Sequence, residues 1–289
     1  WIGIRGAAVA GAVALGLAGL LFFKYSIEQG LITPTMRVVF GTFTGLGCLV
    51  GSEWLRTRGY RQTAEAISGA GIVILYAAFW AAHVLYHLIG MPLVFGLMVL
   101  VTAACCLLAV RHASLIVAVL GLVGGFATPL LLASGTDRPI GLFGYVLLLD
   151  LGLLAVGRKR SWPSLGVLSL LGTVLLQALW IVARMGPARL FLGLVILAVF
   201  AVLFVLAGRL AGGREPRGAW LWSQVGAILF PFAFALYFAG RVGLGPHLYP
   251  IAILLALLSA GACWVAREQK VPALGAGAAT ASVVVTAVW

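Results

Sequence analysis

The sequence predicts an all-α fold, a polytopic helical membrane bundle, and three observations support this. Apolar residues make up 63% of the 289 residues and charged residues only 9%, whereas a soluble domain is about half apolar and about a quarter charged. The apolar runs are continuous rather than alternating, which excludes a transmembrane β-barrel. The basic residues fall between the runs, as orientation signals do. Because backbone groups cannot stay unpaired in hydrocarbon, the spanning segments are expected to be helices.

About eleven transmembrane helices are expected, one single helix followed by five hairpins, all within one transmembrane domain over residues 1–289. Several of the apolar segments are shorter than the roughly 20 residues of a full crossing, so tilt or polar flanks must help them to span. The chain begins at Trp1 rather than Met, and it is expected to be a fragment of a longer protein. The apolar segments are 6–23, 36–52, 66–86, 92–110, 113–132, 141–156, 163–182, 187–207, 219–239, 247–266 and 271–289.

Basic residues orient the predicted helices. Of the 19 Lys and Arg residues, thirteen fall on the side of Trp1: Arg5, Arg56, Arg58, Arg61, Arg111, Arg158, Lys159, Arg160, Arg209, Arg214, Arg217, Arg267 and Lys270. The other six are Lys24, Arg37, Arg138, Arg184, Arg189 and Arg241. The positive-inside rule therefore predicts a cytoplasmic N-terminus and a C-terminus on the outer side. The net charge of +12 is explained in this way without nucleic acid.

The basic turns recur along the chain at about 50-residue intervals, as internal repeats of transporters do. They centre near residues 59, 111, 159, 213 and 268. Any string of helical hairpins would give the same pattern, and the units share little side-chain identity. True structural repetition and a plain string of hairpins both remain open.

The third segment carries a polar stripe that falls on one helical face and consists of Glu65, Tyr76, Trp80, His83 and His87. One interpretation is a cavity wall or proton path, since polar groups on a membrane helix should face protein or water. The other is an interfacial belt, where Trp, Tyr and His are favoured. The "HVLYH" pair has metal-ligand spacing without a third ligand, so no metal is predicted.

A second group of polar residues is expected at the outer ends of the first three segments. Together they form a candidate pocket for an anionic head group or solute. Four of its members come from the stretch "FFKYSIEQGLITPTMR", namely Lys24, Tyr25, Glu28 and Arg37, and the third segment adds His83 and His87. The simpler alternative is that Lys24 snorkels, Tyr25 anchors the helix at the interface, and Pro34 begins the next helix.

The fifth segment, "GLVGGFATPLLL", contains residues that weaken a helix, namely Gly124, Gly125 and Pro129. A break there would free backbone groups at membrane depth. A bond from the Thr128 hydroxyl back to the backbone would leave only a kink, which is the favoured interpretation. Glycine pairs at G-x-x-x-G spacing in the second and fifth segments predict close helix contacts in a compact bundle.

Asp150 lies inside the apolar stretch "GYVLLLDLGLLAVGRKR", about 12 Å below Arg158 and close to a bilayer midplane. An ionised Asp facing lipid there would cost about 2.5–3.5 kcal/mol, so the side chain is expected to face protein. A structural Asp and a functional protonatable group both remain open. The candidate partners are Gln177, Thr173, Tyr145 and Tyr76, of which Thr173 is nearest in depth.

No catalytic pattern is present: the chain has no nucleophile elbow, P-loop or zincin motif, and an enzyme is not the expected function. No cofactor is predicted. The cysteines lie inside apolar runs and are interpreted as small packing residues.

Four stretches occur together, in the same order, in a known family: "FFKYSIEQGLITPTMRV", "GAGIVILYAAFWAAHVLYHLI", "AVLGLVGGFATPLLLASG" and "LFGYVLLLDLGLLA". The chain therefore resembles the bacterial multi-spanning membrane proteins filed as domain of unknown function twenty-three thirty-nine, well over residues 1–180 and more loosely beyond. The resemblance implies a longer parent protein with more spans and often a soluble or coiled N-terminal part. It implies no substrate and no active site.

The expected function is transport or flipping of an envelope-related solute or lipid-linked intermediate, in a bacterial cytoplasmic (inner) membrane. The expected path is a cavity lined by the first, third, fifth and sixth helices, with Asp150, Tyr76, Trp80, Glu65 and Thr128 as cavity or proton-relay candidates. The alternatives are a non-transporting scaffold for envelope assembly and a membrane-embedded glycan or lipid transferase. Expected partners are membrane lipids and a lipid-linked or anionic small molecule, with no nucleic acid.

Overall fold

The computed structural model describes residues 32–132, 139–211, 218–241 and 248–288, and these residues form α-helices joined by short turns. A π-helical turn, Ala81–Leu85, extends α3, and a 3-10 turn, Pro187–Arg189, precedes α8. The helices are α2 (Pro34–Thr57), α3 (Arg61–Trp80), α4 (Met91–His112), α5 (Leu115–Leu131), α6 (Pro139–Arg160), α7 (Pro163–Arg184), α8 (Leu190–Ala211), α9 (Gly218–Ala239), α10 (Leu248–Gln269) and α11 (Pro272–Val288).

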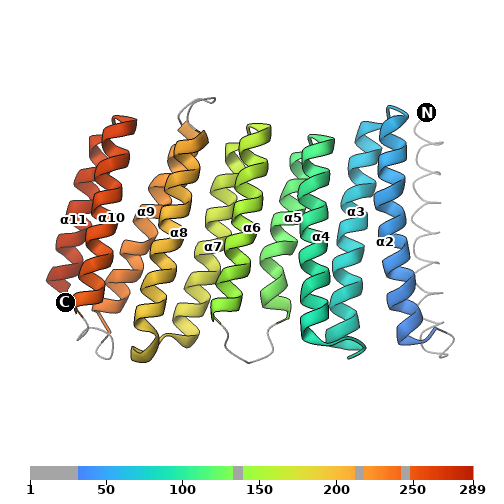
Figure 1. Cartoon of the computed structure of the whole chain (residues 1–289), viewed down its shortest axis with the longest axis horizontal. Coiled ribbons are helices and arrows are strands. Elements are labelled where there is room, and N and C mark those ends of the chain that lie inside the picture. The colour runs from blue at the N-terminus through green and yellow to red at the C-terminus, as the bar shows by residue number, and fades with distance from the viewer. Residues whose placement is uncertain (1–31, 133–138, 212–217, 242–247, 289) are drawn as a thin grey trace, which may run out of the picture.

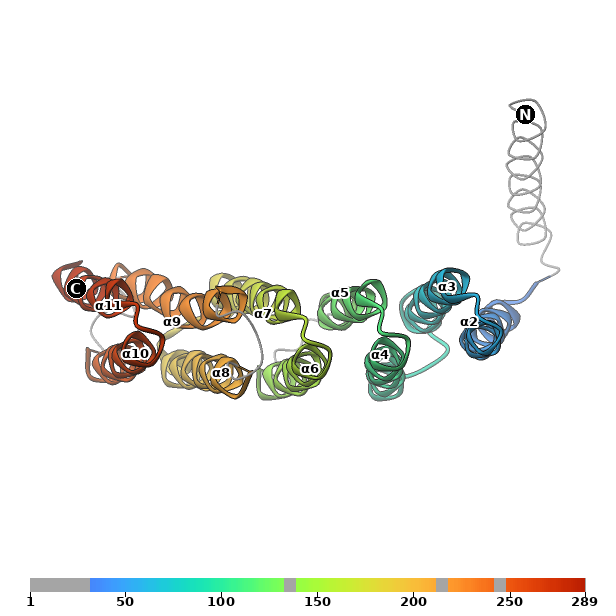
Figure 2. The same ribbon diagram turned by 90° about the horizontal axis from the view of Figure 1, so that it is seen from above.

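The helices stand side by side in a long row that is two helices thick (Figures 1 and 2). Each consecutive pair forms a hairpin, as predicted, and contributes one helix to each layer. One layer contains α2, α4, α6, α8 and α10, and the other contains α3, α5, α7, α9 and α11. The all-α membrane fold is confirmed. Its helices are not gathered around a common centre, so the compact bundle suggested by the glycine spacings is not what forms.

Eight of the described helices are long and apolar enough to cross a membrane. The helices α5 and α11 are apolar but have 17 residues each. At 1.5 Å per residue they rise about 26 Å, slightly less than the roughly 30 Å hydrocarbon core. The first predicted segment, 6–23, lies outside the described residues, so the predicted count of eleven spans is not confirmed.

Four of the hairpin turns share one backbone motif. Each contains a residue with left-handed φ just after the first helix: Gly59 (90°), Ala113 (53°), Ser161 (59°) and Lys270 (56°). In each turn the next residue donates its backbone N–H to the carbonyl five positions earlier, at 3.1, 3.3, 2.8 and 3.0 Å respectively. This is the six-to-one bond of a Schellman motif. Because this motif ends about a third to a half of all helices, its recurrence fits both structural repetition and a plain string of hairpins.

These turns all lie at the same end of the row, which we call the basic end (Figure 1). Its described cations are Arg56, Arg58, Arg61, Arg111, Arg158, Lys159, Arg160, Arg209, Arg267 and Lys270. The described cations of the opposite end are Arg37, Arg184, Arg189 and Arg241. The helices therefore separate the basic residues as the sequence predicted.

Glycine permits a close contact between α2 and α3. A Cβ at Gly45 would lie 2.6 Å from the Leu75 side chain, and one at Gly71 would lie 2.8 Å from the Gly45 carbonyl oxygen. The second segment holds two G-x-x-x-G spacings, Gly41 with Gly45 and Gly47 with Gly51, and the latter two have nothing within 4 Å of an added Cβ. Only one of the two spacings therefore marks an interface.

The α5 helix is continuous through its weak residues. Pro129 lies inside the helix, and Thr128 Oγ1 donates a hydrogen bond of 2.8 Å to the Gly124 carbonyl. This is the bond that was expected to prevent a break. The absence of a side chain at Gly124 lets the Tyr76 ring of α3 lie directly against the α5 backbone.

Candidate functional site

Asp150 is completely buried between α6 and α7. Thr173 Oγ1 donates a hydrogen bond of 2.6 Å to its Oδ2, and Ser169 Oγ donates to its Oδ1. Thr173 was one of the predicted partners, whereas Ser169 was not. Both carboxylate oxygens thus face hydroxyl donors on one neighbouring helix, which confirms that the side chain faces protein rather than lipid.

The missed partner had a signal in the sequence. Ser169, Thr173 and Gln177 are spaced by four residues, so they follow one face of α7. All three side chains are buried, and the Nε2 group of Gln177 has no hydrogen-bond partner among the described residues. The described residues therefore contain no hydrogen bond between Asp150 and Gln177, which were predicted to be in contact. The two observed partners of Asp150 lie on the same face of α7 as Gln177.

Tyr76 and Tyr145 make separate contacts at membrane depth. The Tyr76 hydroxyl lies 2.7 Å from Thr102 Oγ1 of α4, and Thr102 donates in turn to the Met98 carbonyl. The Tyr145 hydroxyl donates a bond of 2.8 Å to the Gly125 carbonyl of α5. Neither tyrosine has a hydrogen bond to Asp150 among the described residues, and the backbones of α3 and α6 do not lie close to each other. The structure does not bring Tyr76 and Asp150 together.

The predicted stripe on α3 is divided among different surroundings. Glu65 accepts a hydrogen bond of 2.8 Å from the Ser114 hydroxyl at the start of α5, which ties two hairpins together. Trp80 is half-buried against the core. His83 Nδ1 lies 2.8 Å from the Ile89 carbonyl, and His87 is exposed in the following turn, with a φ of 49°. The stripe was predicted from α-helical spacing. Because the helix changes from α to π at Ala81, that spacing no longer applies to the two histidines.

At the end opposite the basic end, Arg37 of α2 approaches Tyr86. Its Nη1 donates a bond of 3.3 Å to the Tyr86 hydroxyl, and its guanidinium carbon lies 5.7 Å from the centre of the ring. Lys24, Tyr25 and Glu28, which were expected to complete a pocket here, lie outside the described residues. Tyr86 was not predicted as a member of this group.

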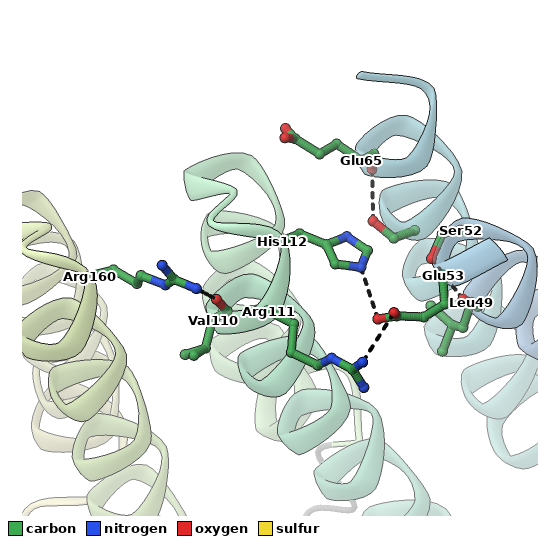
Figure 3. Close-up of polar contacts among 9 residues, drawn as sticks. Leu49, Ser52, Glu53, Glu65, Val110, Arg111, His112 and Arg160 are labelled. Carbon is green, nitrogen blue, oxygen red and sulfur yellow. Dashed lines mark hydrogen bonds and ion pairs between the residues drawn. The ribbon is translucent and has the colours of Figure 1, made fainter. Parts of the chain in front are cut away.

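The most connected polar cluster lies at the basic end and was not predicted (Figure 3). Glu53 of α2 has one carboxylate oxygen 3.0 Å from His112 Nε2 and the other 3.4 Å from an Arg111 nitrogen. Arg160 of α6 donates to the Val110 carbonyl near the end of α4. The cluster thus joins three hairpins through side chains that are far apart in the sequence.

A pocket of about 360 Å³ opens beside this cluster, between the ends of α2 and α4, and is lined by Glu53, Arg56, Thr57 and Arg111. The His112 side chain is buried behind it, and its Nδ1 has no hydrogen-bond partner among the described residues. The pocket is open to the surroundings and lies at the helix ends, beyond the apolar parts of α2 and α4. Such a site can hold a small anionic group against two guanidinium groups.

Within the described ranges, no three His, Cys, Asp or Glu side chains are grouped in a way that could hold a metal ion.

Comparison with known proteins gives one match. A family model described as "Predicted membrane protein (DUF2339)" matches residues 4–288. No curated protein and no solved structure matches the chain. The match confirms the resemblance seen in the sequence, and it covers both residues 1–180 and the part beyond, where the resemblance was looser.

Proposed function

The chain belongs to the DUF2339 family of predicted membrane proteins, and we propose that it acts as a membrane-embedded scaffold for envelope assembly. A scaffold needs a stable wall within the bilayer that presents surface to neighbouring molecules. Partners would be membrane lipids and other membrane proteins that lie against the wall.

The observation that carries this proposal is how the polar groups at membrane depth are used. Asp150 accepts hydrogen bonds from two hydroxyl groups of α7. The Tyr76 hydroxyl is hydrogen-bonded to Thr102 of α4, and the Tyr145 hydroxyl donates to a backbone carbonyl of α5. Each of these contacts joins two neighbouring helices of the row. Buried polar groups that are satisfied in this way fix how helices pack. They support a structural role for the membrane interior.

The two broad faces of the row supply the surface. Large apolar side chains are exposed along both layers, including Leu148 of α6 (69%) and Leu175 of α7 (56%). A two-layer row gives each helix one side facing outward, so its lateral surface is larger than that of a round bundle with the same helices.

The proposed location is the bacterial inner membrane, with the basic end in the cytoplasm. The support is the separation of the described cations between the two ends. The N-terminus would then be cytoplasmic and the C-terminus would lie on the outer side. Reporter fusions at the two ends, read for cytoplasmic and external location, test the orientation.

Transport or flipping of a lipid-linked or anionic small molecule is the second candidate, because α7 carries a buried polar line at membrane depth. Ser169, Thr173 and Gln177 follow one face, and Asp150 lies beside two of them. A carboxylate within a membrane span is a candidate proton-relay group by default. Gln177 would extend such a relay toward the end opposite the basic end.

A flux assay separates the two candidates. The purified protein is reconstituted in liposomes, and proton leak and exchange of a fluorescent lipid between leaflets are measured. The scaffold proposal expects rates equal to those of protein-free liposomes. Rates above that level in wild type, lost in Asp150→Asn with unchanged reconstitution, would support transport and contradict the scaffold.

A second experiment tests for the scaffold directly. A photo-crosslinking amino acid is placed in cells at Leu148 or Leu175, with the fully buried Leu153 as the matched control. Discrete protein adducts are expected from the two exposed positions and none from Leu153. Lipid adducts alone at both exposed positions would contradict a scaffold that works through its broad faces.

A further inference from the structure

We propose that an anionic phospholipid binds between α2 and α4 at the basic end, with its phosphate in the pocket beside Glu53 and an acyl chain along the apolar surface below. This site is separate from the polar groups at membrane depth and does not depend on the proposed function.

The pocket has the size and chemistry for a phosphate head group. Its volume is about 360 Å³, within the roughly 300–1,000 Å³ range of small-molecule sites. Arg56 and Arg111 supply two guanidinium groups, whose planar donors match phosphate oxygens in pairs. Arg111 reaches outward, with 67% of its side chain exposed.

The charge balance of the pocket is positive. Glu53 is held by His112 and Arg111, so its charge is offset by the Arg111 guanidinium (Figure 3). Arg56 is half-buried and forms no ion pair with any described residue. One guanidinium is therefore left to be neutralised by something that enters the pocket.

The ends of α2 and α4 oppose anion binding, because a helix C-terminus carries partial negative charge. The attraction must therefore come from the arginine side chains themselves. This makes the site sensitive to their removal, and the experiment below uses that sensitivity.

An apolar surface continues from the pocket toward the middle of the membrane. On α4, the stripe lies on the same helical face as Arg111 and consists of Leu107, Leu100 and Leu93. On α2, the stripe lies on the same face as Glu53 and consists of Leu46 and Val39, which precede Glu53 in steps of seven residues. All five side chains are exposed, Leu100 at 66%. Seven-residue steps keep a face nearly constant, so each stripe runs along its helix below the polar group.

The backbones of α2 and α4 do not lie close to each other. The α2 backbone lies close to α3 and the π-helical turn, and it is linked to α4 through the Glu53 side chain, which contacts Arg111 and His112. The backbones of α4 and α6, the next neighbours in the same layer, do lie close to each other. A polar pocket above two apolar stripes is the arrangement that an amphiphile needs. The arginines make an anionic phospholipid the fitting occupant, and they disfavour an apolar helix from another copy of the chain.

The test is lipid binding by the purified chain in detergent, followed by native mass spectrometry. The probes are phosphatidylglycerol and phosphatidylcholine with identical acyl chains. Wild type is expected to retain phosphatidylglycerol at least about 10-fold more strongly, and the double variant Arg56→Gln/Arg111→Gln is expected to lose this preference, since each cation near a membrane surface contributes about fivefold. Glu53→Gln, which removes the competing carboxylate, is expected to increase binding.

The matched control is Arg158→Gln/Lys159→Gln, which removes the same charge from the same end but outside the pocket. It should keep binding within about twofold of wild type. Equal retention of the two lipids by wild type, or equal losses in the two double variants, would overturn the proposal. So would displacement of the lipid by millimolar inorganic phosphate alone, which would indicate a free-anion site, or a stable dimer that covers the pocket.

A second pair of variants tests the apolar stripe without touching a charge. Leu100→Trp enlarges an exposed side chain of the α4 stripe, and Leu148→Trp makes the same change on α6, at a similarly exposed position of the same layer. Leu100→Trp is expected to reduce retention of phosphatidylglycerol at least about fivefold. This corresponds to the loss of roughly one buried CH₂ group of the lipid acyl chain. Full retention in Leu100→Trp would show that no acyl chain lies along α4 there.

Discussion

Asp150 of α6 and Thr173 of α7 are joined by a hydrogen bond of 2.6 Å between two side chains that are almost entirely buried. Ser169 donates to the other carboxylate oxygen from one helical turn away. The pairing favours the present register of α6 against α7, because it is the register in which both carboxylate oxygens meet a hydroxyl donor of α7. The two bonds are a buried polar link within the central hairpin.

The first prediction concerns the energy of this pairing. The double change Ser169→Ala/Thr173→Val removes both donors and should destabilise the protein, because the carboxylate loses its partners in an apolar interior. In an Asp150→Leu background the same double change should cost much less. The difference, a coupling energy, is expected to be about 1–2 kcal/mol, in the upper range of hydrogen bonds measured in membrane proteins.

Unfolding in a detergent titration measures these free energies. The control is Ser164→Ala on the same helix, at an exposed position, which should have no coupling to residue 150. Equal costs of the double change in both backgrounds would show that the three side chains do not act as a unit.

The second prediction concerns the glycines of α2. Gly45→Val should weaken packing of α2 on α3 by about 1–3 kcal/mol, because its Cβ would overlap Leu75 and approach the α3 backbone. Gly47→Val, two residues away, has nothing within 4 Å of its Cβ and should change stability by under about 1 kcal/mol. Thermal unfolding, monitored by a fluorescent probe on α2, gives the comparison. Similar losses in both variants would mean that the contact does not depend on Gly45.

The third prediction concerns the left-handed residues of the hairpin turns. Ala113→Gly and Ser161→Gly should each stabilise the protein by about 0.5–1 kcal/mol, because glycine adopts a positive φ without steric cost. Gly59→Ala should destabilise by a similar amount, since its φ is 90°. Melting temperatures of the three variants test the sign of each change. A lower melting temperature for Ala113→Gly would contradict the left-handed turn.

The fourth prediction concerns the link between α3 and α5. Ser114→Ala removes both the hydroxyl at the start of α5 and the donor to Glu65, and it should cost about 1–2 kcal/mol. Thr33→Ala removes an exposed cap of the same kind from α2, without a second partner, and should cost less. Unfolding free energies of the two variants isolate the contribution of Glu65. A smaller loss for Ser114→Ala than for Thr33→Ala would show that the bond to Glu65 is not stabilising.

The helices themselves were predictable, because a long apolar run has one stable conformation in a membrane. The ten predicted segments that fall on described residues each coincide with a helix, usually with polar residues added at the ends. The common end of the basic turns followed from the same reasoning. Thr173 could be named as a partner of Asp150 because depth along a helix follows from its rise.

The two-layer row could not be predicted from hydrophobicity. Lipid tails are as apolar as leucine, so an apolar side chain gives no sign of whether it faces lipid or another helix. Leu148 and Leu149 are adjacent and alike in sequence, yet the first is 69% exposed and the second 5%. The cluster of Glu53, Arg111 and His112 was missed for a related reason. Its members lie on two helices that share no close backbone contact, so nothing in their spacing brings them together.

The repeated turn has a consequence for how such a chain can change in length. A hairpin crosses the bilayer twice, so its insertion or deletion leaves every later segment on its original side. A single added helix would invert everything after it. Since each hairpin packs mainly on the hairpins next to it, the row can grow or shrink by whole pairs while both its topology and its remaining contacts persist.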